Sequence, residues 1–395
     1  MHSLPKLPTA CCRKFFVSFR KIARVAMRLP DGWPPRTLGT LRRQVLAWFD
    51  ANQRSLPWRE NRDPYRVWLS EVMLQQTTVA AVVPYFQRFL KTFPTLRDLA
   101  AADEQEVLKL WEGLGYYRRA RHLHAAAKRI IADHGGKFPA DATAVADLPG
   151  VGRYILGAVL SQAFEQKFPI VEANSLRVLA RLFGYRNDPR EGEGRVWVWE
   201  AATAVLPEKR IGDFNQAVME LGALVCTPTS PKCPSCPWAK SCIANRDSLQ
   251  TLIPPPKKPP VIVACREIAV VIRHREKVLV CRRSPDAKRW ANLWEFPHAD
   301  WPAEELFEDA VGRIAEELTG VAVSPGRELL TIQHGVTRFA ITMTAAEAQR
   351  QSGQFRSPFY SEGRWVSPGE LKDYPTSTPQ RKLFLEVSRP QQRLF

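Results

Sequence analysis

Apolar residues recur at helical spacing through the first half of the chain. Positions i, i+3 and i+4 are apolar in four long segments, namely residues 41–51, 68–93, 104–112 and 119–134. One apolar stripe at this spacing is typical of a helix that packs on a core. The pattern predicts an all-α domain over residues 37–245.

A proline-rich segment ends this pattern. Five prolines stand between Pro254 and Pro260, and proline can neither continue a helix nor donate a hydrogen bond in a central strand. We therefore expect residues 246–262 to form a stiff connector. The chain has 395 residues, which is long enough for two cores.

Beyond the connector, short β-branched runs alternate with helical spacing. This mixture predicts an α+β domain over residues 263–395. The expected strands are residues 267–272, 277–281, 329–333 and 337–344, and the expected helices are residues 303–318 and 379–387.

The chain is strongly basic, with a formal net charge of +17 and a pI near 9.7. Such a charge favours a polyanionic partner, most simply nucleic acid, although an ordinary basic protein fits the charge alone equally well. No run of eighteen apolar residues is present, so we expect no membrane span.

The first 36 residues carry eight Lys or Arg and one acid. We expect them to form a disordered basic extension, with a start codon placed too early or a targeting signal as alternatives. The cysteines are not spread in pairs as in a secreted scaffold, which favours a reducing compartment. The expected location is the cytoplasm of a bacterium, at the nucleoid.

Four cysteines form a cluster with the spacing C-x6-C-x2-C-x5-C, and they are Cys226, Cys233, Cys236 and Cys242. Four thiolates in one short loop can hold a metal ion or an iron–sulfur cluster. Zinc ribbons usually carry two C-x2-C pairs, whereas only Cys233 and Cys236 have that spacing here. We therefore expect one [4Fe–4S] cluster, with zinc as the alternative.

A glycine-containing turn, Leu148-Pro-Gly-Val-Gly152, precedes the apolar segment 154–164. The glycines permit a tight turn with positive φ, and the helix that follows presents free N–H groups to an anion. Such a turn can bind a DNA phosphate without reading the base sequence. The expected DNA-binding residues are Leu148, Gly150, Val151 and Gly152.

Together with Leu56-Pro-Trp-Arg59 and two further segments, residues 64–77 and 113–121, these motifs resemble the MutY-type adenine DNA glycosylases. That family belongs to the helix-hairpin-helix, iron–sulfur endonuclease III superfamily. The resemblance implies a helical bundle over about residues 57–164 and an iron–sulfur lobe from residues 37–56 and 165–245. Trp290-Ala-Asn-Leu-Trp-Glu-Phe-Pro297 resembles the start of the family's Nudix-like second domain.

The resemblance also implies four catalytic residues. Glu71 matches the acid that protonates adenine, although taken alone it reads more simply as a structural carboxylate on a helix. Glu172 and Asn174 match an Asp that stabilises the cationic sugar and an Asn that orients it. Glu172 has the alternative role of beginning a helix. Tyr154 stands where endonuclease III has a lysine, which implies no strand cleavage.

Further residues match positions that contact the damaged DNA in the family. Gln75, Gln76 and Tyr116 match residues that wedge into the base stack after the target base leaves it. Thr337 and Arg338 lie where the family has its loop for sensing 8-oxoguanine. The loop sequence departs from the family pattern.

The resemblance therefore implies a monomeric, monofunctional glycosylase that removes adenine opposite 8-oxoguanine or guanine from double-stranded DNA. One alternative is a pyrimidine or mismatch-thymine glycosylase like endonuclease III. Another is a lesion-binding protein whose catalysis is impaired at Glu172. A Nudix nucleotide hydrolase is less well supported, because residues 312–317 lack the leading Arg-Glu pair of the metal-binding helix.

Overall fold

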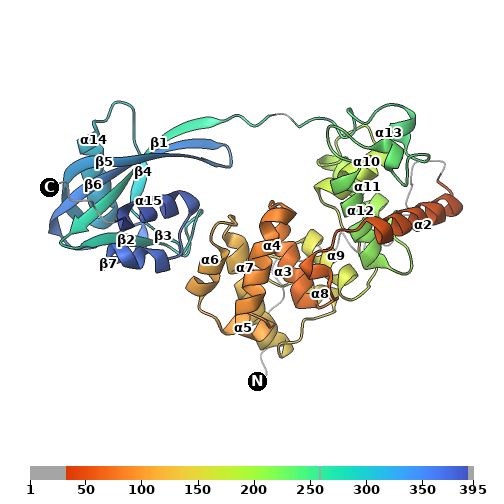
Figure 1. The fold of residues 1–395 in the computed structure, drawn as a ribbon, viewed down its shortest axis with the longest axis horizontal. Helices are drawn as coiled ribbons and strands as arrows, with labels where there is room; N and C mark the ends of the chain where they lie inside the picture. The colour runs from red at the N-terminus through yellow and green to blue at the C-terminus, as the bar shows by residue number, and fades with distance from the viewer. Residues whose placement is uncertain (1–32, 258, 390–395) are drawn as a thin grey trace, which may run out of the picture. The chain divides into compact units, whose positions relative to one another are not determined.

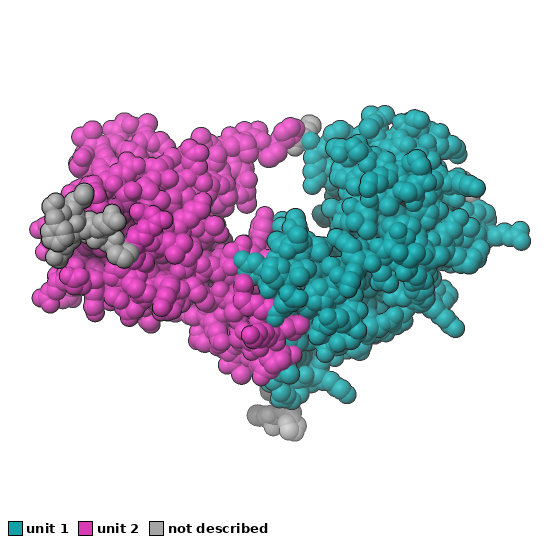
Figure 2. Space-filling model, in the orientation of Figure 1, with its two compact units in different colours: residues 1–87, 95–97, 125–257 teal, residues 88–94, 98–124, 258–395 magenta. Residues whose placement is uncertain are grey.

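The computed structural model describes residues 33–257 and 259–389. Most of the basic extension expected at residues 1–36 lies outside the described residues. The chain divides into two compact units, coloured in Figure 2. The first unit comprises the chain up to Gln87, Thr95–Arg97 and Ala125–Lys257, and the second comprises Arg88–Pro94, Asp98–His124 and the chain from residue 258 onward.

The described residues before 258 form helices and turns, without a strand, as the sequence predicted. Figure 1 shows the helices along the chain. They are α2 (Pro35–Asn52), α3 (Pro64–Leu74), α4 (Val79–Thr92), α5 (Leu96–Ala101), α6 (Glu104–Trp111), α7 (Arg118–His134), α8 (Ala142–Ala146), α9 (Arg153–Gln162), α10 (Ala173–Phe183), α11 (Gly192–Val205), α12 (Ile211–Leu224) and α13 (Ile243–Arg246), with the short 3-10 turns η1 (Pro57–Arg59) and η2 (Cys233–Ser235).

The segment 68–93, which has continuous helical spacing, is broken into α3 and α4. The break falls at Gln75 and Gln76, and Gln76 has a left-handed φ of 59°. Apolar spacing continues across the turn, so the pattern alone could not reveal it. The break places both glutamines in a turn, where Gln75 is half-buried and Gln76 is exposed.

The cysteine loop shares a core with α2. Phe49 of α2 packs in one buried cluster with Leu179 of α10 and Phe214 of α12. The indole N–H of Trp238, inside the cysteine loop, donates to the carbonyl oxygen of Leu41 at 2.9 Å. Burial of this apolar surface therefore joins segments that lie almost 200 residues apart in sequence.

The start of the proline-rich segment is attached to the first unit at Ile253 and Pro255. The side chain of Ile253 is buried against Ala180 and Ala244. Arg181 donates to the carbonyl oxygen of Ile253 at 2.8 Å, and Arg190 donates to that of Pro255 at 2.7 Å. These bonds hold the start of the proline-rich segment against α10 and the loop that follows it.

The part of the second unit that follows the proline-rich segment is built on a seven-stranded mixed sheet, which confirms the predicted α+β class. The strand order is β3-β2-β1-β6-β5, with β4 on β1 and β7 on β2, and only the β1–β6 pair is parallel. The strands are β1 (Val263–His274), β2 (Lys277–Arg283), β3 (Trp294–Glu295), β4 (His298–Asp300), β5 (Val321–Val336), β6 (Phe339–Gly353) and β7 (Tyr360–Val366).

Helices cover both faces of this sheet, as Figure 1 shows. Helix α14 (Phe307–Thr319) packs on one face through Ile314, and α15 (Thr378–Ser388) packs on the other through Phe384. The 3-10 turn η3 (Pro368–Asp373) precedes α15. In the described part of the chain, no helix is long and apolar enough to span a membrane.

The prediction of a strand beginning at Thr337 was wrong. Thr337 has a left-handed φ of 54° and joins β5 to β6 together with Arg338, and both residues are exposed. A β-branched residue favours extended backbone in a sequence pattern. Here the tight register between Val336 and Phe339 requires a turn instead.

Candidate active site

Glu71 lies near the end of α3, a helix whose start is fixed by two residues. The carboxylate of Asp63 accepts the backbone N–H groups of Tyr65 and Arg66 at 2.7 and 3.1 Å, and Pro64 occupies the first helical position. Both features are typical of a well-capped helix. The helix then turns Glu71 inward, where it is only 4% exposed.

Two side chains of α9 bind the carboxylate of Glu71. The hydroxyl of Tyr154 donates a short hydrogen bond to Oε2, and the amide of Gln162 donates to Oε1 at 2.8 Å. Tyr154 and Gln162 stand eight residues apart, so they lie on the same stripe of the helix. The structure therefore brings Tyr154 into contact with Glu71, and it adds Gln162, a polar residue at the end of an apolar helix that the sequence did not mark as functional.

Burial raises the pKa of Glu71 above the usual value of a carboxyl, because the charged form loses its hydration. Hydrogen bonds from Tyr154 and Gln162 and the charge of Arg59 oppose this rise. The hydroxyl of Tyr154 is also buried, and its pKa is raised first by burial and then by the charge of Glu71. A carboxyl in this setting can hold a proton closer to neutral pH than an exposed one and can donate it to a base.

Glu172 caps the N-terminus of α10. Its carboxylate accepts the backbone N–H of Asn174 at 2.8 Å and that of Ser175 at 2.7 Å, while the hydroxyl of Ser175 accepts the N–H of Glu172 at 2.9 Å. This reciprocal pair is a capping box. The capping role that the sequence left open is therefore present in the structure.

The cap does not isolate Glu172 from the acid on α3. Burial raises the pKa of Glu172, the two backbone hydrogen bonds and Arg177 lower it, and the charge of Glu71 raises it further. The two carboxyl groups thus influence each other electrostatically in a buried region. Their environments differ, because Glu172 receives backbone N–H groups whereas Glu71 receives only side-chain donors.

Asn174 contacts Glu172 by its backbone rather than by its side chain. Its amide oxygen accepts from Arg177 at 2.8 Å. The same guanidinium donates to the carbonyl oxygens of Gly222 and Cys226 at 2.9 and 2.8 Å. Asn174 therefore positions Arg177, which links the Glu172 cap to the beginning of the cysteine loop.

A second buried acid lies on α12. Glu220 is 1% exposed and accepts from the backbone N–H and guanidinium of Arg54 and from Arg59 at 2.7 to 3.0 Å. Burial alone would raise the pKa of Glu220, but the hydrogen bonds from the two arginines lower it to about 2. In the sequence, Arg59 stands out only as part of the Leu56–Arg59 motif, and no local pattern marks Glu220, whose partners are 161 and 166 residues away.

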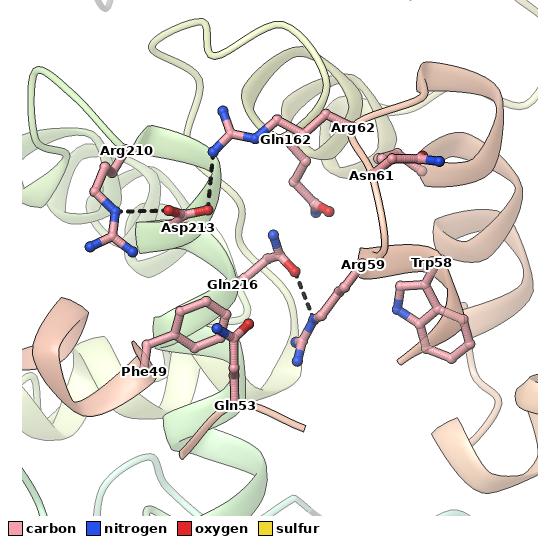
Figure 3. Close-up of a pocket in the computed structure, with 11 residues that line it drawn as sticks. Phe49, Gln53, Trp58, Arg59, Asn61, Arg62, Gln162, Arg210, Asp213 and Gln216 are labelled. Atoms are coloured by element: carbon pink, nitrogen blue, oxygen red, sulfur yellow. Dashed lines mark hydrogen bonds and ion pairs between the residues drawn. The ribbon is translucent and has the colours of Figure 1, made fainter. Parts of the chain in front are cut away.

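A pocket adjoins this network, and Figure 3 shows its lining. Arg59 extends into it and donates to Gln216 at 2.8 Å, and Trp58 and Gln162 also line it. Gln162 and Arg59 therefore face the pocket and act on Glu71 as well. The lining residues are Phe49, Gln53, Trp58, Arg59, Asn61, Arg62, Val67, Gln162, Arg210, Asp213 and Gln216.

The glycine turn before α9 has a tight backbone that is exposed at its two glycines. Gly150 has a φ of 77°, and the N–H of Val151 donates to the carbonyl oxygen of Leu148 at 3.1 Å. Gly152 directly precedes the first residue of α9, and no atom outside Gly152 and its chain neighbours lies within 4 Å of the position that a Cβ would take there. Gly150 and Gly152 are exposed, so their backbone can approach a phosphate, whereas the buried Leu148 anchors the turn.

The expected wedge and sensing residues lie in three exposed turns. Gln75 and Gln76 occupy the α3–α4 turn of the first unit. Tyr116, in the second unit, is 53% exposed with a left-handed φ of 50°. Thr337 and Arg338 form the β5–β6 turn, where the hydroxyl of Thr337 donates to the carbonyl oxygen of Val336 at 2.7 Å.

The four cysteines of the C-x6-C-x2-C-x5-C loop are half-buried. Burial first, and then the charges of Cys226, Cys242 and Cys233, raise the pKa of Cys236 to about 12, so the four thiols interact electrostatically. Arg181 donates to the sulfur of Cys226 at 3.4 Å. Among the described residues, no three His, Cys, Asp or Glu side chains form a group arranged to hold a metal ion. The set of soft donors nevertheless fits an iron–sulfur cluster in kind.

Comparison with known proteins matches both parts of the chain. Residues 69–200 match the model of the HhH-GPD superfamily base excision DNA repair protein, and residues 268–386 match the NUDIX domain. The second match agrees with the sheet and its two covering helices. The first match includes the Glu71, Tyr154 and Glu172 positions.

Three of the similar proteins are described as adenine DNA glycosylases. The protein from Buchnera aphidicola subsp. Schizaphis graminum is 37% identical over 65% of this chain and 74% of its own. The human protein is 32% identical over 87% of this chain and 73% of its own. The rat protein is 45% identical over 52% of this chain and 42% of its own. The chain therefore belongs to the family of adenine DNA glycosylases, enzymes that remove adenine in base-excision repair.

Proposed function

We propose that this enzyme removes adenine opposite 8-oxoguanine or guanine in double-stranded DNA and leaves the strand intact. The observation that carries this proposal is the buried carboxyl of Glu71, held by Tyr154 and Gln162 and with a raised pKa. A buried acid of this kind suits a reaction in which a poor leaving group must be protonated.

In the proposed reaction, adenine leaves the base stack and Glu71 donates its proton to a ring nitrogen. The bond between C1′ and the base then breaks, its electron pair goes to the protonated adenine, and positive charge develops on the sugar. The carboxylate of Glu172 stabilises this charge. Water adds to C1′, and its proton returns to Glu71, so that adenine and an abasic site are the products.

Tyr154 supports a reaction without strand cleavage. A lyase needs an amine that attacks C1′ and forms a covalent imine. The tyrosine hydroxyl at this position cannot form an imine, and it donates its hydrogen to Glu71. We propose that Tyr154 orients Glu71 rather than acting as a nucleophile.

Three features support DNA binding. The exposed backbone of the turn at Gly150 and Gly152 can bind a phosphate. The exposed ring of Tyr116 can stack on a base. The turn with Thr337 and Arg338 presents a hydroxyl and a guanidinium, which can bond the carbonyl groups of 8-oxoguanine and a neighbouring phosphate.

A glycosylase assay on defined duplexes tests this function. The duplexes hold adenine, thymine or an oxidised pyrimidine opposite 8-oxoguanine and guanine. We expect release of adenine alone, with nicking of the product only after alkali or heat. Thymine release at a comparable rate would support the rival mismatch-thymine activity, and stoichiometric borohydride trapping would contradict a monofunctional mechanism.

We also propose that Cys226, Cys233, Cys236 and Cys242 hold one [4Fe–4S] cluster, as is typical of the superfamily. A bound cluster would cross-link the loop that follows α12 and would stabilise its packing on the helical core. The bond from Arg181 to the sulfur of Cys226 supports the assignment, since a guanidinium donor stabilises a negatively charged acceptor such as a cluster ligand.

Anaerobic purification tests the cluster. The protein should be brown and should contain about four iron and four sulfide per chain. Serine in place of Cys236 should lower the iron content and the melting temperature together. Stoichiometric zinc in protein purified from iron-replete cells would overturn the assignment.

A further inference from the structure

The turn that carries Tyr116 lies between α6 and α7 and has a demanding backbone. Gly113, Gly115 and Tyr116 all have positive φ, at 94°, 74° and 50°. Glycine adopts such angles without cost, but a tyrosine does so only where its surroundings hold it. The exposed ring of Tyr116 therefore depends on how firmly the turn is fixed.

Local contacts fix part of the turn. The indole N–H of Trp111 donates to the carbonyl oxygen of Gly115 at 3.0 Å, and Arg119 donates to the same oxygen at 3.2 Å. The guanidinium of Arg119 also stands 5.4 Å from the centre of the Tyr116 ring. These bonds fix the turn at Gly115. The residues on its two sides, Glu112 and Tyr117, are held by other partners.

The flanking residue on the α6 side is held by α15. Arg381 binds both carboxylate oxygens of Glu112 through Nε and Nη2, and the second bond measures 2.8 Å. The two side chains are only 17% and 15% exposed. A two-point ion pair shielded from water fixes orientation as well as distance.

The flanking residue on the α7 side is held by the segment just before α15. The hydroxyl of Tyr117 accepts the N–H of Gly113 at 3.3 Å and donates to the carbonyl oxygen of Thr376 at 2.8 Å. Thr376 is fully buried. One hydroxyl therefore joins the first residue of the turn to the part of the unit that contains the sheet.

We propose that Arg381 and Thr376 are positioning residues, which act on DNA recognition by holding Glu112 and Tyr117 and thereby presenting the ring of Tyr116. The sheet-containing part of the second unit would then influence lesion recognition by a route additional to the Thr337 and Arg338 turn. This inference rests on the proposed function, in which Tyr116 inserts beside the lesion.

Helix α6 also contacts the sheet-containing part of the unit at its other end, and this second contact provides a control. At the other end of α6, Asn292 donates to Glu104, and the indole N–H of Trp294 donates to Gln105 at 2.9 Å. Glu104 is joined to the same part of the unit, and to Arg121 of α7 at 3.5 Å, at the end of α6 opposite the turn. Glu104→Gln is therefore the matched control for Glu112→Gln.

The test compares Glu112→Gln, Tyr117→Phe and Glu104→Gln in the full-length protein, each with and without Tyr116→Ala. The readouts are single-turnover excision from an adenine:8-oxoguanine duplex and the fluorescence of 2-aminopurine placed beside 8-oxoguanine. The fluorescence is measured on a duplex whose target adenosine carries a 2′-fluorine that prevents cleavage. The probe reports unstacking directly and does not depend on catalysis.

We expect Tyr116→Ala to reduce both signals. Glu112→Gln and Tyr117→Phe should each lower excision by about three- to tenfold, as for the loss of one or two hydrogen bonds, and should reduce the 2-aminopurine response. Neither should add to the effect of Tyr116→Ala, because both act through that ring. Glu104→Gln should leave both signals near those of the unchanged protein.

Full additivity with Tyr116→Ala, or an equal loss with Glu104→Gln, would overturn the inference while leaving the role of Tyr116 intact. If Tyr116→Ala itself changed neither signal, the wedge assignment in the proposed function would fail instead. Should Glu112→Gln lower the melting temperature, Tyr117→Phe decides the matter, since it removes one oxygen and no charge.

Discussion

Replacing Glu71 with glutamine should abolish adenine excision, with a fall in the single-turnover rate of at least roughly 10³-fold. The amide keeps the size of the side chain and an acceptor for Gln162, but it has no proton to give to adenine. The measurement is single-turnover release of adenine from an 8-oxoguanine duplex. Glu71→Gln activity within tenfold of the unchanged enzyme would show that another group protonates the base.

The same variant provides its own folding control. Because the pKa of Glu71 is raised in the folded protein, ionisation is more costly there than in the unfolded chain. This carboxyl therefore reduces stability as the pH rises above the ordinary carboxyl value. At neutral pH, Glu71→Gln should unfold at the same or a higher temperature than the unchanged protein. Lost activity in a protein that is no less stable then reports on chemistry.

The pH dependence of the unchanged enzyme should have a definite sign. The reaction needs Glu71 protonated, so the single-turnover rate should fall as the pH rises through the raised pKa of this group. Tyr154→Phe removes a hydrogen bond that lowers that pKa, so its falling limb should move to higher pH. A limb that stays in place would show that Tyr154 does not tune the acid.

Glu172→Gln should lower the single-turnover excision rate by a factor on the order of 100, because it removes the negative charge that faces a cationic sugar. Duplex affinity should change little, since phosphate contacts dominate binding. The variant also weakens the cap of α10, because an N–H₂ group replaces one of the two oxygens that accept the N–H groups of Asn174 and Ser175. Loss of a cap typically costs about 1 kcal/mol.

Glu172→Asp separates the two roles of this side chain. Aspartate is a good cap and keeps the charge, so the excision rate should stay within about tenfold of the unchanged enzyme, with no loss of stability. Near-normal excision by Glu172→Gln would exclude a catalytic charge at this position and leave Glu172 as a cap alone. A large loss with both variants and an unchanged melting temperature would mean that the longer reach of glutamate is required.

The sequence by itself determined the broad organisation of the protein. The change from helical spacing to short β-branched runs on either side of Pro254 predicted the two fold classes, since periodicity reports which side of a local segment is buried. The turn at Gly150 and the cysteine motif could also be recognised in the sequence, because both depend on residues that are close together in the chain. The role of Glu71 came from resemblance, as a lone glutamate on a helix carries no signal of its chemistry.

The tertiary structure decided what joins distant segments. Only the packing of α3 on α9 brings Gln162 to Glu71, 91 residues away. Only the fold shows that both carboxylate oxygens of Glu172 accept hydrogen bonds from the N-terminus of α10. The same holds for Glu112 and Arg381, which lie 269 residues apart. Local patterns record how a segment is buried but not which segment buries it. The partners that set a carboxyl's pKa, or hold a strained turn, are therefore fixed by long-range packing.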